Sequence, residues 1–320
     1  MQNGNELTLS VVVPAYNEEE VLPAFHKRLC DVLDKLGISS EILYINDGSN
    51  DKTLDVLNAL QDSRVAIIDL SRNFGKEIAM TAGLDHAKGE AVVVIDADLQ
   101  DPPELIPKFI EKWQEGYDVV YAQRTARDGE TFLKKATAKL FYRFIQGVSR
   151  VKIPEDTGDY RLLSRRAVES LKQLRETHRF MKGLFAWIGY PQIAVSYHRD
   201  PRFAGSTKWN YWHLWNFAIE GITSFTINPL KIASYLGLTT SIVSFTYILF
   251  VIYKTLAFGE PVQGYPSLMI VVLFLGGVQL MSLGVIGEYL GRMFNETKQR
   301  PLYIINSVSP ATSQTGPGKL

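Results

Sequence analysis

One stretch decides the fold: residues 92–104, which read VVVIDADLQDPPE. Its run of β-branched residues is too short for a helix and predicts a buried strand. The strand ends in Asp96 and Asp98, and the prolines behind them cannot continue a sheet. Alternation along an extended backbone places both carboxylates on the same side, at the carboxyl end of the strand. In open α/β sheets this edge is where ligands bind.

Two interpretations of this acidic pair stay open. Carboxylates held close together repel each other, and a divalent cation between them and a ligand would stabilise the pair. Alternatively, the pair forms an acidic turn that caps the helix expected from Pro103, where Asp is a common residue. The spacing of the two carboxylates alone does not distinguish a metal site from a cap.

The composition of the 320-residue chain excludes several classes of function. Lys plus Arg and Asp plus Glu balance at 34 each, so no basic field predicts a nucleic-acid partner. The single cysteine, Cys30, excludes an intramolecular disulfide framework and a cysteine-based zinc site. The first ten residues are polar and predict no secretory signal. Neither a G-x-G-x-x-G nor a P-loop motif occurs, which argues against dinucleotide dehydrogenases and P-loop enzymes.

Strands alternate with helices through the N-terminal part of the chain. Short apolar runs predict strands at residues 9–14, 41–46, 65–69, from 92, and at 117–122. Helical spacing predicts helices that include residues 21–36, 76–84 and 104–115. This alternation predicts an α/β fold with a doubly wound, mostly parallel sheet.

Polar residues follow three of the expected strands, at Tyr16, Asp47 and Asp96. They mark the edge of the sheet that should bind a ligand. Asn17 is expected to cap the helix that follows the first strand.

A basic segment lies between the soluble part and the apolar end of the chain. Arg199, Arg202 and Lys208 fall within ten positions around a Gly-Ser-Thr turn. Such a cluster suits a phosphate or a pyrophosphate. A solvated basic loop is the alternative.

The last third of the chain predicts a membrane hairpin. Residues 236–257 and 266–289 are long and apolar enough to cross a bilayer as helices. Residues 210–228 carry tryptophans at helical spacing and predict an interfacial helix. Glycines in the second span would permit close helix packing, so a homo-oligomer stays open. Residues 307–320 are rich in Ser, Thr, Pro and Gly and are expected to be disordered.

Charges at the ends of the hairpin predict its orientation. Lys231 precedes the first span, and Arg292, Lys298 and Arg300 follow the second. By the positive-inside rule, both flanks and the soluble part lie in the cytoplasm.

Four motifs carry a resemblance to a known family: VPAYNE at residues 13–18, NDGS at 46–49, DADLQDPPE at 96–104 and GDYRL at 158–162. In this order they resemble the family 2 glycosyltransferases of the GT-A fold. With the two spans behind them, the chain is similar to the polyprenyl-phosphate glycosyltransferases, which include dolichol-phosphate mannose synthases. The greatest similarity is to the bacterial bactoprenol (undecaprenyl-phosphate) glucosyltransferases.

The resemblance implies four parts in a multi-pass protein of the bacterial inner membrane with both termini in the cytoplasm. They are a GT-A domain at residues 1–208, an amphipathic interfacial helix region at 209–229, a two-helix transmembrane domain at 230–292 and a cytoplasmic tail at 293–320.

The resemblance also implies how the donor is held. The residues that would bind the nucleotide-sugar are Pro14, Tyr16, Glu18, Asp47, Lys76, Asp96 and Arg124. Asp47 would read the base or the ribose. Asp98, with Asp96 and Gln100, would bind Mg²⁺ or Mn²⁺ on the donor diphosphate.

The remaining implied roles concern the acceptor and the reaction. Arg199, Arg202 and Lys208 would bind the acceptor lipid phosphate or the donor diphosphate. Asp98 and Asp159 would be catalytic, with Asp159 at the position proposed as a base. Yet a phosphate monoester has a second pKa of about 6 and is largely dianionic at neutral pH. We therefore expect Asp159 to position the acceptor or a cationic side chain.

The expected reaction is inverting transfer of glucose from UDP-glucose to undecaprenyl phosphate. GDP-mannose, UDP-GlcNAc or a UDP-aminoarabinose derivative would leave similar motifs. A processive polysaccharide synthase would carry a Q-x-x-R-W motif and more spans, and a transporter would carry paired intramembrane charges. A catalytically silent membrane scaffold is the rival from a different class.

Overall fold

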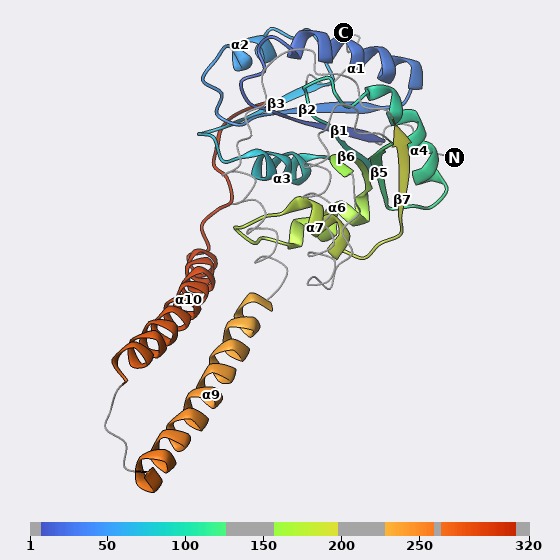
Figure 1. Cartoon of the computed structure of the whole chain (residues 1–320). Coiled ribbons are helices and arrows are strands. Elements are labelled where there is room, and N and C mark those ends of the chain that lie inside the picture. Colours follow the sequence, from blue (N-terminus) through green and yellow to red (C-terminus); the bar gives the residue numbers. More distant parts are fainter. Residues whose placement is uncertain (1–7, 126–156, 198–227, 259–263, 312–320) are drawn as a thin grey trace, which may run out of the picture.

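Within the residues that the structure describes, 8–125, 157–197, 228–258 and 264–311, eight strands form one mixed sheet in the computed structural model (Figure 1). The strands are β1 (Leu9–Ala15), β2 (Ser40–Asn46), β3 (Val65–Leu70), β4 (Ala91–Val94), β5 (Val119–Arg124), β6 (Thr157–Ser164), β7 (Gln192–Tyr197) and β8 (Ile305–Ser309). Their order across the sheet is β7-β5-β6-β4-β1-β2-β3-β8.

The helices connect and cover these strands. They are α1 (Leu22–Leu36), α2 (Thr53–Asn58), α3 (Lys76–His86), the 3₁₀ turn η1 (Pro103–Leu105), α4 (Ile106–Gln114), α6 (Arg165–Gln173), α7 (Met181–Trp187), α9 (Asn228–Phe258) and α10 (Tyr265–Thr297).

The sheet confirms the expected α/β class. Strands β4, β1, β2 and β3 run parallel side by side, as the sequence predicts. Strand β6 lies antiparallel between β4 and β5, and β8 lies antiparallel on the outer edge of β3. The sheet is therefore mostly parallel, with β6 and β8 as its antiparallel strands.

Alternate residues of the central strands are buried on opposite faces of the sheet. Val11 and Val13 pack on the face covered by α1 and α4, whereas Val12 packs on the face covered by α3, α6 and α7 (Figure 1). Burial of each such side chain contributes about 1.5–3 kcal/mol relative to its exposure. These two apolar layers fix the strands, and with them the positions of the polar loops at their carboxyl ends.

The turn after β4 differs from the extended run that the sequence indicates. Strand β4 ends at Val94, so Asp96 and Asp98 lie in the following turn, where Leu99 has a φ of 59°. Neither η1 nor α4 has a side-chain cap, which excludes the interpretation of the acidic pair as a helix cap.

The expected cap at Asn17 is also wrong. Helix α1 begins after Val21 and has no side-chain cap. The Asn17 side chain instead accepts a hydrogen bond from the backbone N–H of Asn50 at 2.9 Å, across to the loop after β2.

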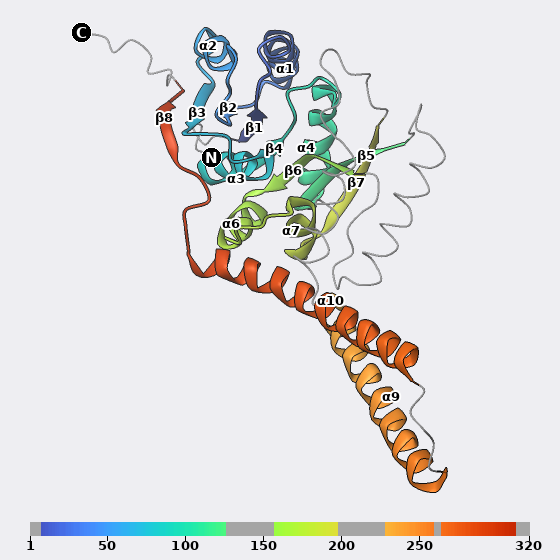
Figure 2. The ribbon, with the colours of Figure 1, turned by 60° about the vertical axis from the view of Figure 1, so that its left-hand side comes forward.

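Helices α9 and α10 extend away from the sheet as a pair (Figures 1 and 2). Residues Ala233–Phe258 and Phe274–Thr297 are long and apolar enough to cross a membrane, at the places where the sequence predicts two spans. Large apolar side chains face outward along them, such as Leu256 and Leu280, which are 83% and 71% exposed. The interfacial helix expected before α9 lies outside the described residues.

The expected disorder from residue 307 is wrong for the first part of that segment. Strand β8 pairs antiparallel with β3, with Val308 opposite Ile68. Most side chains of β8 are exposed, so backbone hydrogen bonds to the open edge of β3 hold it rather than apolar burial.

Candidate active site

A lysine joins two carboxylates at the carboxyl end of β4. Lys76 is the first residue of α3, and its Nζ lies 2.7 Å from Asp96 Oδ2 and 2.6 Å from Asp159 Oδ2. Asp96 comes from the turn after β4. Because β6 runs antiparallel to β4 with Arg161 opposite Val94, Asp159 falls beside this turn. Three residues that are distant in the sequence thus meet.

Burial and neighbouring charges shift the pKa values of this cluster. Burial alone would raise the pKa of Asp159, but the ammonium groups of Lys76 and Lys182 outweigh it and hold that pKa below its ordinary value. Burial opposes charge on Lys76 as well, yet the two carboxylates raise its pKa well above the ordinary value. Burial, with the charges of Asp159 and Asp101, raises the pKa of Asp96 against the attraction of Lys76. Oδ1 of Asp159 is buried and has no hydrogen-bond partner among the described residues.

These features fit a divalent cation. A positive charge would offset the burial and the neighbouring carboxylates that together raise the pKa of Asp96. The turn adds the carboxylate of Asp98, whose Oδ1 accepts a hydrogen bond from the backbone N–H of Gln100 at 3.1 Å. Carboxylate and amide oxygens are ligands that Mg²⁺ and Mn²⁺ prefer.

A second layer of polar residues supports the cluster. The Tyr197 hydroxyl donates a hydrogen bond to Asp101 and accepts one from Arg124 Nε at 3.4 Å. A Cβ at Gly158 would lie 3.2 Å from the Arg124 guanidinium, so this arginine packs closely against the strand that carries Asp159. The structure thereby brings the predicted residue Arg124 to the cluster, held by the Tyr197 hydroxyl, which is itself bonded to Asp101.

The residues expected to bind the nucleoside lie in two loops that are hydrogen-bonded to each other. Pro14 is in β1, and Tyr16 and Glu18 follow it. The backbone N–H of Asn17 donates to Ser49 Oγ at 3.0 Å, and that of Glu18 donates to Thr53 Oγ1 at 2.8 Å. The loops after β1 and β2 therefore form one rigid frame at the carboxyl edge of the sheet.

Asp47 is part of this frame. Its carboxylate is 3% exposed and accepts hydrogen bonds from the backbone N–H groups of Phe74 and Gly75, at 2.7 and 2.9 Å. These bonds fix the start of α3 and hence the position of Lys76. The expected contact of Asp47 with a base or ribose stays a prediction.

Gly48 allows the loop after β2 to approach the segment that follows β3. It has a φ of 62°, and a Cβ there would lie 2.3 Å from the backbone carbon of Arg72. Only glycine fits this position without displacing the chain that leads to Lys76.

Comparison with known proteins identifies the family. The model of glycosyl transferase family 2 matches residues 10–172, which run from the second residue of β1 through β6 and include Lys76, Asp96 and Asp159. The chain belongs to the family 2 glycosyltransferases. A second model, the GtrB C-terminal hairpin, matches residues 228–293, which are α9 and most of α10.

Close relatives of this family 2 glycosyltransferase match over nearly the whole chain. An uncharacterized glycosyltransferase of Synechocystis is 56% identical and covers 94% of this chain and 96% of its own length. The bactoprenol glucosyl transferase of Shigella phage SfV is 50% identical and covers 94% of this chain and 99% of its own length.

A solved structure is more distant. Glucosyl-3-phosphoglycerate synthase from Mycobacterium tuberculosis, in complex with Mn²⁺, UDP-glucose and phosphoglyceric acid, is 21% identical with a TM-score of 0.46. It covers 68% of this chain and 77% of its own length.

Two further residues of the glycosyltransferase site were not predicted from the sequence. The buried Arg161 donates hydrogen bonds to the backbone oxygens of Gly158 and Asp159, and its guanidinium lies 3.8 Å from the centre of the Phe185 ring. Burial lowers the pKa of Arg161 to about 10. It holds the backbone of the strand that carries Asp159.

The second is Glu77, next to Lys76 on α3. Its Oε2 accepts a hydrogen bond from the backbone N–H of Met181, at the start of α7, at 3.2 Å. Burial and the charge of Asp159 raise the pKa of Glu77 to about 8. The position of Glu77 beside Lys76 is the one sequence signal that could have indicated it. Its contact with α7 depends on the fold and cannot be read from the sequence.

One group outside this site resembles a metal centre. His26, Cys30 and Asp62 lie close together. However, Arg64 already pairs with Asp62 at 2.7 Å, and burial raises the pKa of Cys30 to about 12. Without a metal the thiol keeps its proton and the Asp62 carboxylate is already paired with Arg64, and both features disfavour a cation at this place.

The predicted phosphate-binding residues Arg199, Arg202 and Lys208 lie outside the described residues. Their part in the site stays a prediction.

Proposed function

We propose that this family 2 glycosyltransferase transfers glucose from UDP-glucose to a polyprenyl phosphate, with inversion at the anomeric carbon. The observation that carries the proposal is the presence in one chain of the Lys76–Asp96–Asp159 cluster and an exposed apolar helical hairpin. A water-soluble acceptor requires no such hairpin, whereas a lipid acceptor keeps its phosphate at the membrane surface. The name bactoprenol glucosyl transferase, borne by a relative at 50% identity, supports both the sugar and the lipid.

We place the catalytic domain and both termini on the cytoplasmic face of a bacterial inner membrane. The basic residues that flank the hairpin in the sequence favour this orientation by the positive-inside rule. The apolar surface of α9 and α10 supports insertion, because exposing it to water would be unfavourable.

The proposed cofactor is Mg²⁺ or Mn²⁺, held by Asp96, Asp98 and Gln100. Bound there, the cation would neutralise negative charge that develops on the departing diphosphate. Lys76 and Arg124 supply fixed positive charge beside the same group.

Asp159 acts in this proposal by holding Lys76, not as a base. An acceptor phosphate with a second pKa of about 6 is largely dianionic at neutral pH and needs no deprotonation. One of its oxygens attacks the anomeric carbon as the bond to the donor diphosphate breaks, and in-line attack inverts the configuration. The lowered pKa of Asp159 keeps it ionised and paired with Lys76.

Arg199, Arg202 and Lys208 are proposed to bind the acceptor phosphate. Their segment directly precedes the expected interfacial helix in the sequence, where the headgroups of the membrane would lie.

The test is transfer of radiolabelled sugar to undecaprenyl phosphate by the full-length protein in lipid nanodiscs. The donors are UDP-glucose, GDP-mannose, UDP-GlcNAc and a UDP-aminoarabinose derivative, each with and without EDTA. We expect label in the lipid phase from UDP-glucose, lost with EDTA and restored by Mg²⁺ or Mn²⁺. Label from another donor would correct the assignment of the sugar. Transfer that continues in EDTA would contradict the assignment of a metal cofactor. A folded protein that gives no lipid product from any donor would favour the silent scaffold.

A further inference from the structure

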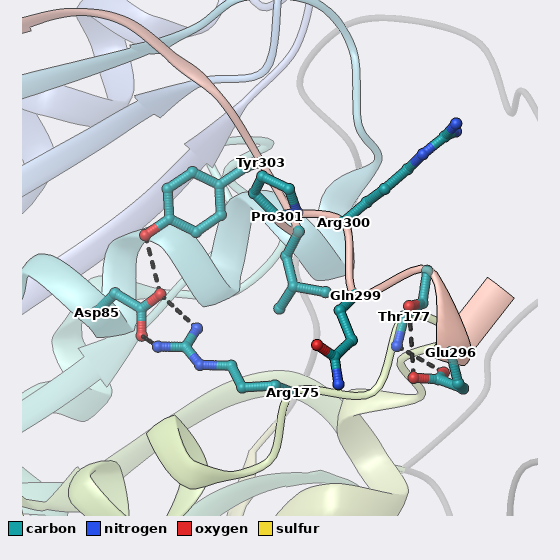
Figure 3. Close-up of a pocket in the computed structure, with 9 residues that line it drawn as sticks. Asp85, Arg175, Thr177, Glu296, Gln299, Arg300, Pro301 and Tyr303 are labelled. Carbon is teal, nitrogen blue, oxygen red and sulfur yellow. Dashed lines mark hydrogen bonds and ion pairs between the residues drawn. The ribbon is translucent and has the colours of Figure 1, made fainter.

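The chain after the second membrane helix returns to the catalytic domain and is fastened there. Figure 3 shows Tyr303 and Arg175 converging on Asp85 at the end of α3. The Tyr303 hydroxyl donates to Asp85 Oδ2 at 2.9 Å, and Arg175 donates to both oxygens of Asp85 at 2.8 and 2.9 Å. These side chains line a pocket of about 610 Å³ between the domain and the end of α10.

The last turns of α10 make a second contact. Glu296 accepts hydrogen bonds from the backbone N–H and hydroxyl of Thr177, at 2.8 and 3.4 Å (Figure 3). Asn295 Nδ2 lies 3.1 Å from His178 Nε2. The helix is therefore joined to the domain before the chain turns toward the sheet.

Beyond the pocket, the segment joins the sheet at β3. The backbone N–H of Ser71 donates to Ile304 O at 2.9 Å, and β8 pairs with β3. From β8, the side-chain amide of Asn306 donates to Asp69 Oδ2 at 2.7 Å. Asp69 is the next-to-last residue of β3 and is 5% exposed.

Asp69 connects this contact to the nucleoside loops. Its other oxygen, Oδ1, accepts a hydrogen bond from the side-chain amide of Asn46 at 2.7 Å. Asn46 Oδ1 in turn accepts one from the backbone N–H of Ser49, and Ser49 Oγ accepts one from the backbone N–H of Asn17. A continuous series of hydrogen bonds thus runs from Asn306 to the loops after β2 and β1.

We infer that Asn306 is a positioning residue for the nucleotide part of the donor, supplied by the segment that follows the second membrane helix. The inference rests on the proposed function, in which these two loops hold the nucleoside. Asp69 orients the Asn46 side chain only if its own carboxylate is held, and the described contacts give it one amide on each oxygen. Removing the Asn306 amide frees one side of Asp69, and the loop after β2 loses its fixed position.

The experiment measures binding of UDP with Mg²⁺ to the full-length protein in nanodiscs by calorimetry. The variants are Asn306→Ala, which removes the amide, and Asn306→Asp, which places a second carboxylate against Asp69. Val308→Ala is the matched control, because Val308 lies on the same strand and is 50% exposed. A typical hydrogen bond corresponds to a roughly three- to tenfold change in an equilibrium constant, and we expect the Kd of Asn306→Ala to weaken by that factor. We expect a larger loss for Asn306→Asp and none for Val308→Ala.

Kinetics distinguish a positioning role of Asn306 from a purely structural one. We expect the KM for UDP-glucose to rise with the Kd while kcat, the KM for undecaprenyl phosphate and the melting temperature stay near wild type. Unchanged UDP binding in both Asn306 variants, or equal loss in every parameter together with a lower melting temperature, would overturn the inference. If the wild type itself binds no UDP, the proposed function fails and this inference fails with it.

Discussion

Two regions at the same edge of the sheet are built in opposite ways. In the loops after β1 and β2, polar groups are paired internally: both oxygens of Asp47 accept backbone N–H groups, and Ser49 and Thr53 bridge the loops. Around Lys76, two carboxylates share one ammonium group, and Oδ1 of Asp159 is buried without a partner among the described residues.

The difference indicates that the two regions have different roles. A region whose hydrogen bonds are already made keeps its shape without a ligand and presents a preorganised surface. A region whose carboxylates are close together in a partly buried place and share one ammonium group is less favourable by itself and is stabilised when a cation binds. We therefore expect substitutions in the first region to change binding and stability, and those in the second to change turnover.

The largest expected effect is at the proposed metal ligands. Asp98→Asn removes an anionic ligand, and we expect kcat for sugar transfer to fall by about 10²–10³-fold. The melting temperature should stay within a few degrees of wild type, because Asp98 contributes charge rather than packing. Asp55→Asn, an exposed substitution on α2, is the control and should leave kcat unchanged. An Asp98→Asn enzyme within threefold of wild type would remove the metal assignment.

Asp159→Asn tests the cluster with a smaller expected effect. The substitution leaves Lys76 paired with Asp96 alone, and the displaced ammonium should lower kcat by about 10–100-fold. The pKa of Asp159 lies below its ordinary value, so it is ionised throughout about pH 6 to 9. If it positions Lys76, the pH profiles of the variant and the wild type run parallel over this range. A base would be revealed by a variant whose rate climbs steeply with pH as hydroxide replaces the carboxylate.

Much of the fold follows from the sequence because its strongest signals are local. The short apolar runs of β1 to β4 and the long apolar segments of α9 and α10 were predicted at their observed places. Strand β6 was not, because Asp159 and Arg161 interrupt its apolar pattern although all eight of its residues are buried. Strand β8 was missed because backbone pairing with β3 stabilises it, and its exposed side chains resemble those of a disordered tail.

The site shows the same limit. The resemblance named Lys76, Asp96 and Asp159, and the structure brings them together. It did not indicate Glu77, Tyr197 or Asn306, because their roles arise from contacts between distant segments. The spacing of Asp96 and Asp98 pointed to the correct edge for a wrong reason, since a turn rather than an extended strand places them.

Asp47 tests the preorganised region. Asp47→Ala leaves the backbone N–H groups of Phe74 and Gly75 without their acceptors, which should lower the free energy of unfolding by about 1–3 kcal/mol. The start of α3 loosens as well, so the KM for UDP-glucose should rise several-fold. Denaturant unfolding and initial rates measure the two effects, with the exposed Asp31→Asn on α1 as the control. Loss of kcat with no change in stability or KM would contradict the view that the first region serves binding and stability and the second serves turnover.

The smallest expected effect is a pH-dependent stability at Glu77, beside the crowded cluster. Its pKa is 4.5 as an ordinary carboxyl and about 8 in the folded protein. Between these values the unfolded chain is ionised while the folded protein keeps its proton, so stability falls as the pH rises. Glu77→Gln removes this titration, and its amide oxygen can still accept from the Met181 N–H. The melting temperature of the variant relative to wild type should therefore climb by a few degrees from about pH 5 to 8 and level off above, whereas the exposed Glu20→Gln gives a flat difference. A flat difference for Glu77→Gln would contradict the raised pKa and would mean that Lys76 and Lys182 compensate the Glu77 carboxylate fully.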